Sequence, residues 1–370
     1  MKDGTSYFLN PALVTMVLMS ALVIMVLVMA GGDPLALARL GSYFYEQNPD
    51  GSQGYDGQFV YYIAINPQPE GVAPYLDAPA YRYQRILFPA IARAVSLGNV
   101  TAIPWALPFL GILFQTVGTL LLSELLAGWG ISRWYALVYG LWVGFGLAIR
   151  LDLPEALAYA LVIGAILAQE RRRNVLSWIL YGLALFAKEV TVLFVMAAFL
   201  SCLFEKRWRD ALGIGLVAGL PFLIFQVWLW QSFGEFGISS GGAMATPFEI
   251  IPFLGLLRIG SYSMVYLLAM AIVFVPAIVI PVLWGLWATL QKLRNQQFNV
   301  VVLALLLNAI AIMFLPFSTF RETGGLLRFA CGLVLAVILF AARYTVRRAL
   351  NYSWFWLSLN VFLFKTGGLL

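Results

Sequence analysis

Long uncharged stretches recur along nearly the whole chain and leave little room for any other architecture. Many are long enough for a helix that crosses, or nearly crosses, the roughly 30 Å hydrocarbon core of a bilayer. The composition agrees, since 62% of the 370 residues are hydrophobic and only 11% are charged, which excludes a soluble globular domain. We therefore expect one transmembrane domain over 1–370, an all-α polytopic bundle of about 10–11 helices. The uncharged stretches are 11–32, 94–123, 134–149, 156–169, 174–187, 190–204, 211–234, 259–291, 295–320, 329–342 and 349–364.

Four clusters of basic residues lie between these stretches. Short cytoplasmic loops of membrane proteins carry an excess of Lys and Arg, so we assign all four clusters to the cytoplasmic side. That assignment places the amino terminus inside and the segment 31–100 outside. It also explains the formal net charge of +6 by topology, so we infer no nucleic-acid partner. The clusters are Arg171-Arg172-Arg173; Lys206, Arg207 and Arg209; Lys292 and Arg294; and Arg343, Arg347 and Arg348.

Two of the expected hairpins are too short to cross a bilayer twice. Segment 174–203 must start and end on the cytoplasmic side, yet it supplies about 45 Å of helix against the roughly 60 Å that two full spans need. We therefore expect the turn at Lys188 and Glu189 below the outer surface, together with the charged tip of hairpin 134–169. Charges facing lipid are costly, so recessed turns favour a hydrated vestibule open to the outside. The alternative makes 174–204 one tilted helix.

The segment 31–100 is the one long connection, and long connections are usually functional. Its stretches 58–65 and 83–97 predict short amphipathic helices at the membrane interface, with tyrosines at headgroup level. The alternative is that the tyrosines and arginines of this segment only anchor it to lipid headgroups.

Asp56 is the candidate catalytic residue. It stands between a tyrosine and a glycine, directly before the first of these stretches. A carboxylate there is expected to cap the helix, to project into the vestibule as a general base, or to do both. The chain contains no histidine, so any general base must be Asp or Glu. Cys202 and Cys331 lie in apolar runs and are expected to pack as small hydrophobic side chains.

The residues around Asp56 resemble a known family. Two runs carry the resemblance to the GT-C superfamily of membrane glycosyltransferases, in particular to bacterial mannosyltransferase-like proteins and the GPI mannosyltransferase 2 type. They are Tyr55-Asp56-Gly57-Gln58-Phe59-Val60-Tyr61-Tyr62-Ile63-Ala64 and Tyr81-Arg82-Tyr83-Gln84-Arg85-Ile86-Leu87-Phe88-Pro89. Weaker similarity covers Ala187-Lys188-Glu189 and Arg321-Glu322-Thr323-Gly324-Gly325-Leu326-Leu327-Arg328.

The resemblance implies a fold, an activity and a location. The fold is a GT-C-like bundle with interfacial helices in the first outer loop. The activity is transfer of a hexose or pentose from a polyprenyl-phosphate donor to an acceptor, with inversion and with Asp56 as the base. The location is the plasma membrane, with the lipid bilayer as a partner and the active site on the extracytoplasmic side. The sugar and the acceptor stay open.

Polar and charged residues of the outer side form the predicted substrate site. Arginine forks match phosphate oxygens and would stabilise a departing phosphate. Lys188 is favoured because a recessed lysine needs a counter-ion, which a lipid phosphate would supply. At least two of the five cations are expected to pair with carboxylates instead. The substrate-binding candidates are Gln58, Tyr62, Arg82, Gln84, Arg85, Lys188, Glu189, Arg321, Glu322 and Arg328.

No cofactor or metal ligand is assigned, because no clear acidic pair accompanies Asp56 in the first outer loop. A divalent metal stays open. A transporter or flippase for a lipid-linked or anionic substrate is the first alternative function, since it would also need a cationic vestibule. Its inverted repeats would place proline breaks in both halves of the chain, whereas the breaks cluster in one. A non-catalytic assembly subunit is the second alternative.

Overall fold

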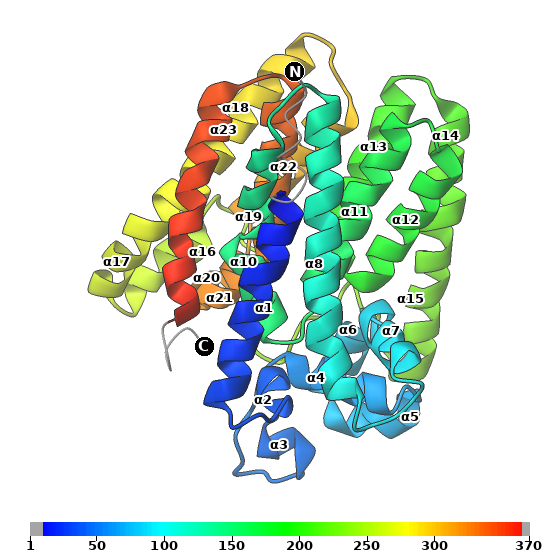
Figure 1. The fold of residues 1–370 in the computed structure, drawn as a ribbon, viewed down its shortest axis with the longest axis vertical. Helices are drawn as coiled ribbons and strands as arrows, with labels where there is room; N and C mark the ends of the chain where they lie inside the picture. The colour runs from blue at the N-terminus through cyan, green and yellow to red at the C-terminus, as the bar shows by residue number, and fades with distance from the viewer. Residues whose placement is uncertain (1–9, 365–370) are drawn as a thin grey trace.

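The computed structural model describes residues 10–364, and every regular element within this range is helical. Five of its helices are long and apolar enough to cross a membrane, so the chain is an α-helical membrane protein. The five are α1 (Pro11–Met29), α8 (Ile103–Gly128), α14 (Trp208–Ile214) continued through η4 (Gly215–Gly219) and α15 (Leu220–Phe233), α17 (Met264–Phe274) continued through η6 (Val275–Val279) and α18 (Ile280–Arg294), and α21 (Thr323–Phe329) leading into α22 (Cys331–Arg343). In Figure 1, α1, α8 and α15 run along the long axis of the molecule, whereas the helix from α17 to α18 crosses it obliquely.

Several uncharged stretches fold as shorter or interrupted helices, so the five long helices are fewer than the roughly 10–11 spans that the sequence predicts. The number of spans therefore stays a prediction. These shorter helices are α9 (Ala136–Gly140), α10 (Val143–Arg150), α11 (Glu155–Glu170), α12 (Asn174–Ala187), α13 (Val192–Phe204), α16 (Leu254–Leu257), α19 (Val300–Met313), α20 (Phe317–Arg321) and α23 (Arg347–Ser353); the remaining 3₁₀ turns are η1 (Ala73–Tyr75), η2 (Arg133–Tyr135), η3 (Glu189–Thr191), η5 (Arg258–Ser261) and η7 (Trp354–Phe364).

Helix α22 forms the centre of the bundle. Every residue from Cys331 to Ala342 is buried, as expected for a helix that is apolar on all sides. Cys331 is among them and Cys202 is buried in α13, so both cysteines pack in the core as free thiols. The helices nearer the lipid expose part of their apolar surface instead, for example Leu120 of α8 and Leu283 of α18.

The chain reverses between α12 and α13. Lys188 leaves the helix with an extended backbone, at φ −159°, and after the short turn η3 the next helix, α13, starts at Val192. The Asn174 side chain at the start of α12 donates a hydrogen bond of 2.8 Å to the carboxylate of Asp210, which closely follows α13. Both ends of 174–204 therefore lie at the same end of the bundle. The predicted reversal at Lys188 and Glu189 is confirmed, and the single tilted helix is wrong. The depth of the turn below the membrane surface stays a prediction.

The four basic clusters gather at one end of the bundle, as predicted. Arg171 pairs with Glu124 in the last turns of α8, and the Arg343 guanidinium lies 5.4 Å from the Trp129 ring just after that helix. Two further contacts join the other clusters at this end. The Lys292 ammonium lies 3.8 Å from the centre of the Tyr344 ring, close to Arg343, and the rings of Phe204 and Phe298 are stacked 4.4 Å apart, between the clusters at Lys206 and Arg294.

Segment 31–100, which we predict to lie outside and call the outer segment, folds into short helices at the opposite end of the bundle, shown in blue and cyan in Figure 1. The helix predicted at 58–65 is α4, but its expected amphipathic character is wrong, because residues 57–64 are all buried. The helix predicted at 83–97 is α7, which is shorter than predicted, and it is amphipathic, with Phe88 buried and Val95 exposed. The helices are α2 (Leu35–Ala38), α3 (Ser42–Tyr45), α4 (Gly57–Ile65), α5 (Pro69–Val72), α6 (Pro79–Tyr83) and α7 (Leu87–Val95).

Candidate functional site

Asp56 precedes α4 but does not cap it, since its side chain makes no hydrogen bond to the first turn of the helix. Its carboxylate turns instead to two arginines from distant parts of the chain. One oxygen lies 3.0 Å from Nη1 of Arg82, and the other lies 3.3 Å from Nη2 of Arg328. About a quarter of the Asp56 side chain is exposed. The capping interpretation is therefore wrong, and Asp56 projects into a charged, partly open site.

Arg82 is held in place from three directions. It lies on the short helix α6, and its guanidinium makes a bidentate ion pair with Asp77, at 2.7 and 2.9 Å. The ring of Phe59 on α4 packs against the guanidinium, at 4.5 Å from the ring centre. Such pairing fixes the orientation of a planar fork. Arg82 therefore reaches Asp56 as a pre-oriented cation.

Arg328 connects the outer segment to the membrane bundle. It lies on α21, buried to 8% exposure, and besides Asp56 it approaches Glu155 and Glu322, each at 3.6 Å. It also donates a hydrogen bond of 2.8 Å to the hydroxyl of Tyr55, which in turn donates to Glu322. One buried cation thus gathers acidic and phenolic groups from three segments.

Two further ion pairs adjoin the contacts of Arg82 and Arg328. Lys188 pairs with the fully buried carboxylate of Glu155 at 2.7 Å, and Arg85 pairs with Glu189 at 2.6 Å. Tyr81 accepts a further hydrogen bond of 2.6 Å from Arg85. The recessed turn at Lys188 therefore contributes both of its charges to the site. Glu155 is the counter-ion of Lys188, so the lysine does not need the lipid phosphate that the sequence argument invoked for this role.

Seven of the predicted site residues come together in this cluster, although they are spread over more than 270 positions of sequence. Four of the five proposed cations are in ion pairs, which confirms the expectation that at least two would be. The seven are Asp56, Arg82, Arg85, Lys188, Glu189, Glu322 and Arg328.

Four predicted residues lie outside the cluster. Gln58 binds the preceding loop: its Oε1 accepts a hydrogen bond of 3.0 Å from the Gly41 amide. Tyr62 is buried among aromatic rings and donates to that same oxygen at 3.3 Å. Gln84 is buried and accepts a hydrogen bond of 3.4 Å from the side chain of Gln226. Arg321 is exposed, and its guanidinium lies 5.8 Å from the ring of Phe317.

The sequence interpretation missed several members of the site. Tyr55, Asp77 and Glu155 were not among its site residues, yet each contacts Arg82 or Arg328. Asp152, three residues before Glu155, is also buried, and neither of its carboxylate oxygens has a hydrogen-bond partner among the described residues. A buried carboxylate without a partner is costly and requires an explanation. The one available signal was that Asp152 and Glu155 lie at the charged tip of a short hairpin.

The cluster closes around very little space. A pocket of about 10 Å³ lies between Asp56, Arg82, Arg85 and the turn at Leu153 and Pro154. That volume admits about one water molecule. A larger polar ligand can enter only if some of the ion pairs separate.

Gly57 lets the outer segment approach the bundle. A Cβ at this position would collide with the backbone carbonyl oxygen of Leu151, in the turn that also carries Asp152. We expect Gly57→Ala to displace the start of α4, to destabilise the protein by about 1–3 kcal/mol as overpacking does, and to move Asp56. Thermal unfolding of the purified protein measures the change. Gly128→Ala is the control, since its Cβ would have no atom within 4 Å; equal unfolding of both variants would contradict the close approach.

Two opposing effects set the pKa of Asp56. Burial would raise it, but the guanidiniums of Arg82 and Arg328 outweigh burial and hold the pKa of the carboxyl well below its usual range. A lowered folded-state pKa stabilises the protein above the unfolded value of about 3.9, and this contribution is lost as the pH falls further. We therefore expect the unfolding temperatures of wild type and Asp56→Asn to differ by a constant amount from about pH 5 to 8 and to converge only below about pH 4. A difference that varied around pH 7 would contradict this assignment.

Within residues 10–364, no three or more Cys, Asp or Glu side chains are arranged to hold a metal ion. Comparison with protein-family models, with curated proteins and with solved structures gave no match. The roles discussed below therefore rest on the residues, their contacts and their chemistry.

Proposed function

We propose that the protein is a glycosyltransferase of the GT-C type that moves a sugar from a polyprenyl-phosphate donor to an acceptor on the extracytoplasmic side of the plasma membrane. The observation that carries the proposal is the position of Asp56. It is a partly exposed carboxylate between two arginines, at the end of a membrane bundle opposite the basic clusters. A transferase with a lipid-linked donor needs a base and phosphate-binding cations side by side, close to the membrane.

The proposed reaction is a single displacement that inverts the anomeric carbon. The acceptor hydroxyl oxygen attacks this carbon while the bond from the carbon to the phosphate oxygen breaks. The proton of the hydroxyl passes to Asp56, and the electron pair leaves with the phosphate. Arg82 and Arg328 stabilise the charge that develops on the phosphate, because both are fixed in place and poorly hydrated.

Donor binding would also activate the base. Arg82 and Arg328 keep Asp56 a weak base in the closed cluster, since they lower its pKa. A phosphate that enters the pocket competes with Asp56 for the same guanidiniums. Their pull on the carboxylate then weakens, so its pKa rises toward the usual range and proton transfer becomes more favourable. The base thus becomes effective when the leaving group is in place.

The experiment is sugar transfer in proteoliposomes supplied with defined polyprenyl-phosphate sugars and candidate acceptors, with and without a chelator. Mass spectrometry of the products identifies a glycosylated acceptor and the released polyprenyl phosphate. Formation of both products supports the proposal, and the effect of the chelator decides whether a divalent metal is required. Absence of transfer with every hexose and pentose donor would contradict it.

One observation favours the transporter alternative. Both of the long interrupted helices contain a π-helical turn, η4 and η6, and such turns are frequent at functional sites. A flippase would move labelled donor lipid across the proteoliposome membrane with its sugar still attached. Intact lipid accessible on the opposite side, without sugar release, would therefore replace the transferase proposal with this one.

A further inference from the structure

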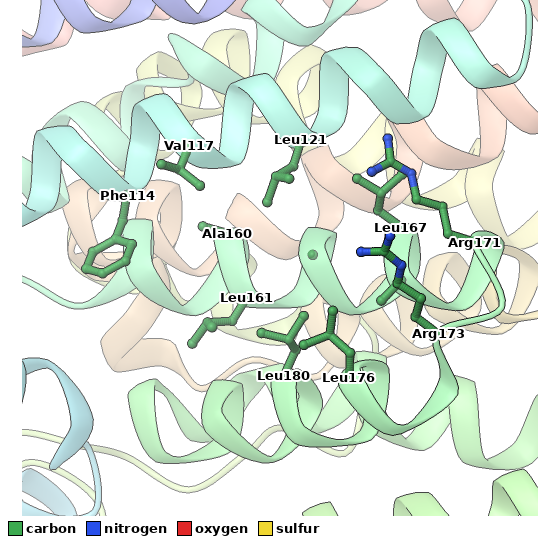
Figure 2. Close-up of a pocket in the computed structure, with 12 residues that line it drawn as sticks. Phe114, Val117, Leu121, Ala160, Leu161, Leu167, Arg171, Arg173, Leu176 and Leu180 are labelled. Carbon is green, nitrogen blue, oxygen red and sulfur yellow. The ribbon is translucent and has the colours of Figure 1, made fainter.

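A second and larger cavity than the pocket at Asp56 lies along the bundle toward its basic end. It is a groove of about 260 Å³ between α8, α11 and α12, drawn in Figure 2. Its walls are apolar along most of their length, and two arginines, Arg171 and Arg173, stand at one end. Figure 2 shows both guanidinium groups turned back over the groove near Leu167.

Small side chains on α11 create the groove. Ala160, Gly164 and Ala168 follow one another at intervals of four residues and therefore share one face of the helix. A Cβ at Gly164 would lie 3.3 Å from Leu180 and 3.6 Å from Leu121, so even one methyl group would narrow the space. A larger residue there would block the groove.

The sides of the groove face lipid. Leu120 on α8 and both Leu176 and Ile179 on α12 are apolar and each 43% exposed in the isolated chain, so acyl chains must cover them in a membrane. The arginines lie at the basic end of the bundle, where the ends of these helices reach the headgroup level. The groove thus runs from the acyl-chain region to a cationic mouth at one membrane surface.

We propose that this groove binds an anionic phospholipid of the leaflet at the basic end, with an acyl chain between α8, α11 and α12 and its phosphate at Arg171 and Arg173. Charge and polarity favour this occupant. Arg171 already pairs with Glu124, whereas the Arg173 side chain has no ion pair or hydrogen bond to any of residues 10–364. The start of α12 has no side-chain cap, so its free amide groups add to the positive potential. Basic pockets between transmembrane helices bind acidic headgroups in this manner.

Other occupants fit less well. A peptide would leave backbone polar groups unsatisfied against the apolar walls. A zwitterionic lipid would bring its own cation to a mouth that is already positive. The proposal does not rest on the proposed transferase activity, because the groove shares no lining residue with the pocket at Asp56 and its cationic mouth lies at the other end of the bundle. An acidic lipid there would link α8, α11 and α12 and so stabilise the helices that carry the recessed charged turns.

The test is binding of phosphatidylglycerol and of phosphatidylcholine to the purified full-length protein, measured by native mass spectrometry and by the unfolding temperature in a neutral detergent. We expect saturable binding of phosphatidylglycerol, accompanied by a higher unfolding temperature. Arg173→Gln should weaken this binding about tenfold, the usual loss for one charge-assisted hydrogen bond. Gly164→Leu should abolish it by filling the groove.

Two matched variants control for charge and for side-chain size. Arg348→Gln removes an exposed charge from the same end of the bundle, and Gly128→Leu adds the same side chain where no atom lies within 4 Å of the Cβ. Both should bind phosphatidylglycerol as the wild type does. Equal binding by all variants, or equal binding of phosphatidylcholine, would overturn the proposal. Tighter, competing binding of a polyprenyl phosphate would overturn the choice of occupant. If Gly164→Leu fails to fold, the Arg173 and Arg348 variants still decide the question.

Discussion

Asp56→Asn is expected to lower the rate of sugar transfer by about 100-fold or more, the range expected for loss of a general base. The amide has nearly the shape of the carboxylate but cannot accept the proton of the acceptor hydroxyl. The fold should survive, because both arginines keep other partners: Arg82 retains Asp77, and Arg328 retains Glu155 and Glu322. Initial rates in proteoliposomes, with an unfolding temperature recorded for each variant, measure the effect.

Asp77→Asn is the matched control for this prediction. It also removes a carboxylate from Arg82. Asp77, however, makes its polar contacts with that arginine and with the backbone amide of Ala243, and it does not reach Arg328. We expect it to retain far more activity than Asp56→Asn. Comparable rates in the two variants would mean that pairing with Arg82, and not the position of Asp56, is what matters. Full activity of Asp56→Asn would remove Asp56 from the chemistry.

The second large effect concerns stability. Glu155→Gln should destabilise the protein by about 3–5 kcal/mol, because it leaves the buried Lys188 without its carboxylate. Glu155 is fully buried and Lys188 is 7% exposed, so water compensates little. The other carboxylates of the site are bound to arginines and do not contact this lysine. The change is measured by reversible chemical unfolding in a detergent or bicelle in which the wild type refolds.

A double-mutant cycle separates the pair from its surroundings. Lys188→Met alone should cost less, since Arg328 still lies 3.6 Å from Glu155, and the double variant should recover part of the loss. The exposed pair of Arg171 with Glu124 is the control, where we expect at most about 1 kcal/mol. Additive effects of the two buried substitutions would contradict a coupled ion pair.

The closed cluster gives a physical reason why substrate entry must involve movement. Four cations face five carboxylates around a pocket with room for about one water molecule, so every cation of the cluster already has a partner. An anionic donor can enter by exchanging partners, and Asp56 is the member best placed to exchange because its side chain is a quarter exposed. The deeper pair of Lys188 and Glu155 is enclosed and is better suited to hold the elements in register.

The sequence alone determined the class of protein, the ends of the bundle and most of the charged residues that meet. Hydrophobic run length and the distribution of Arg and Lys are one-dimensional properties, and they place the basic clusters together because each short loop must return to a membrane surface. The same distribution predicted that the chain reverses at Lys188 and Glu189, which the structure confirms. These arguments need no knowledge of which helix packs beside which.

Only the tertiary structure decided which charged residues form ion pairs with one another. Asp56 could equally have capped α4, and its contact with Arg328 joins residues 272 positions apart, which no local pattern encodes. The structure likewise placed Gln58, Tyr62 and Gln84 in packing contacts outside the cluster, although they share the motif with Asp56. The physical reason is that ion-pair partners depend on the approach and rotation of packed helices, whereas membrane insertion depends on composition along the chain.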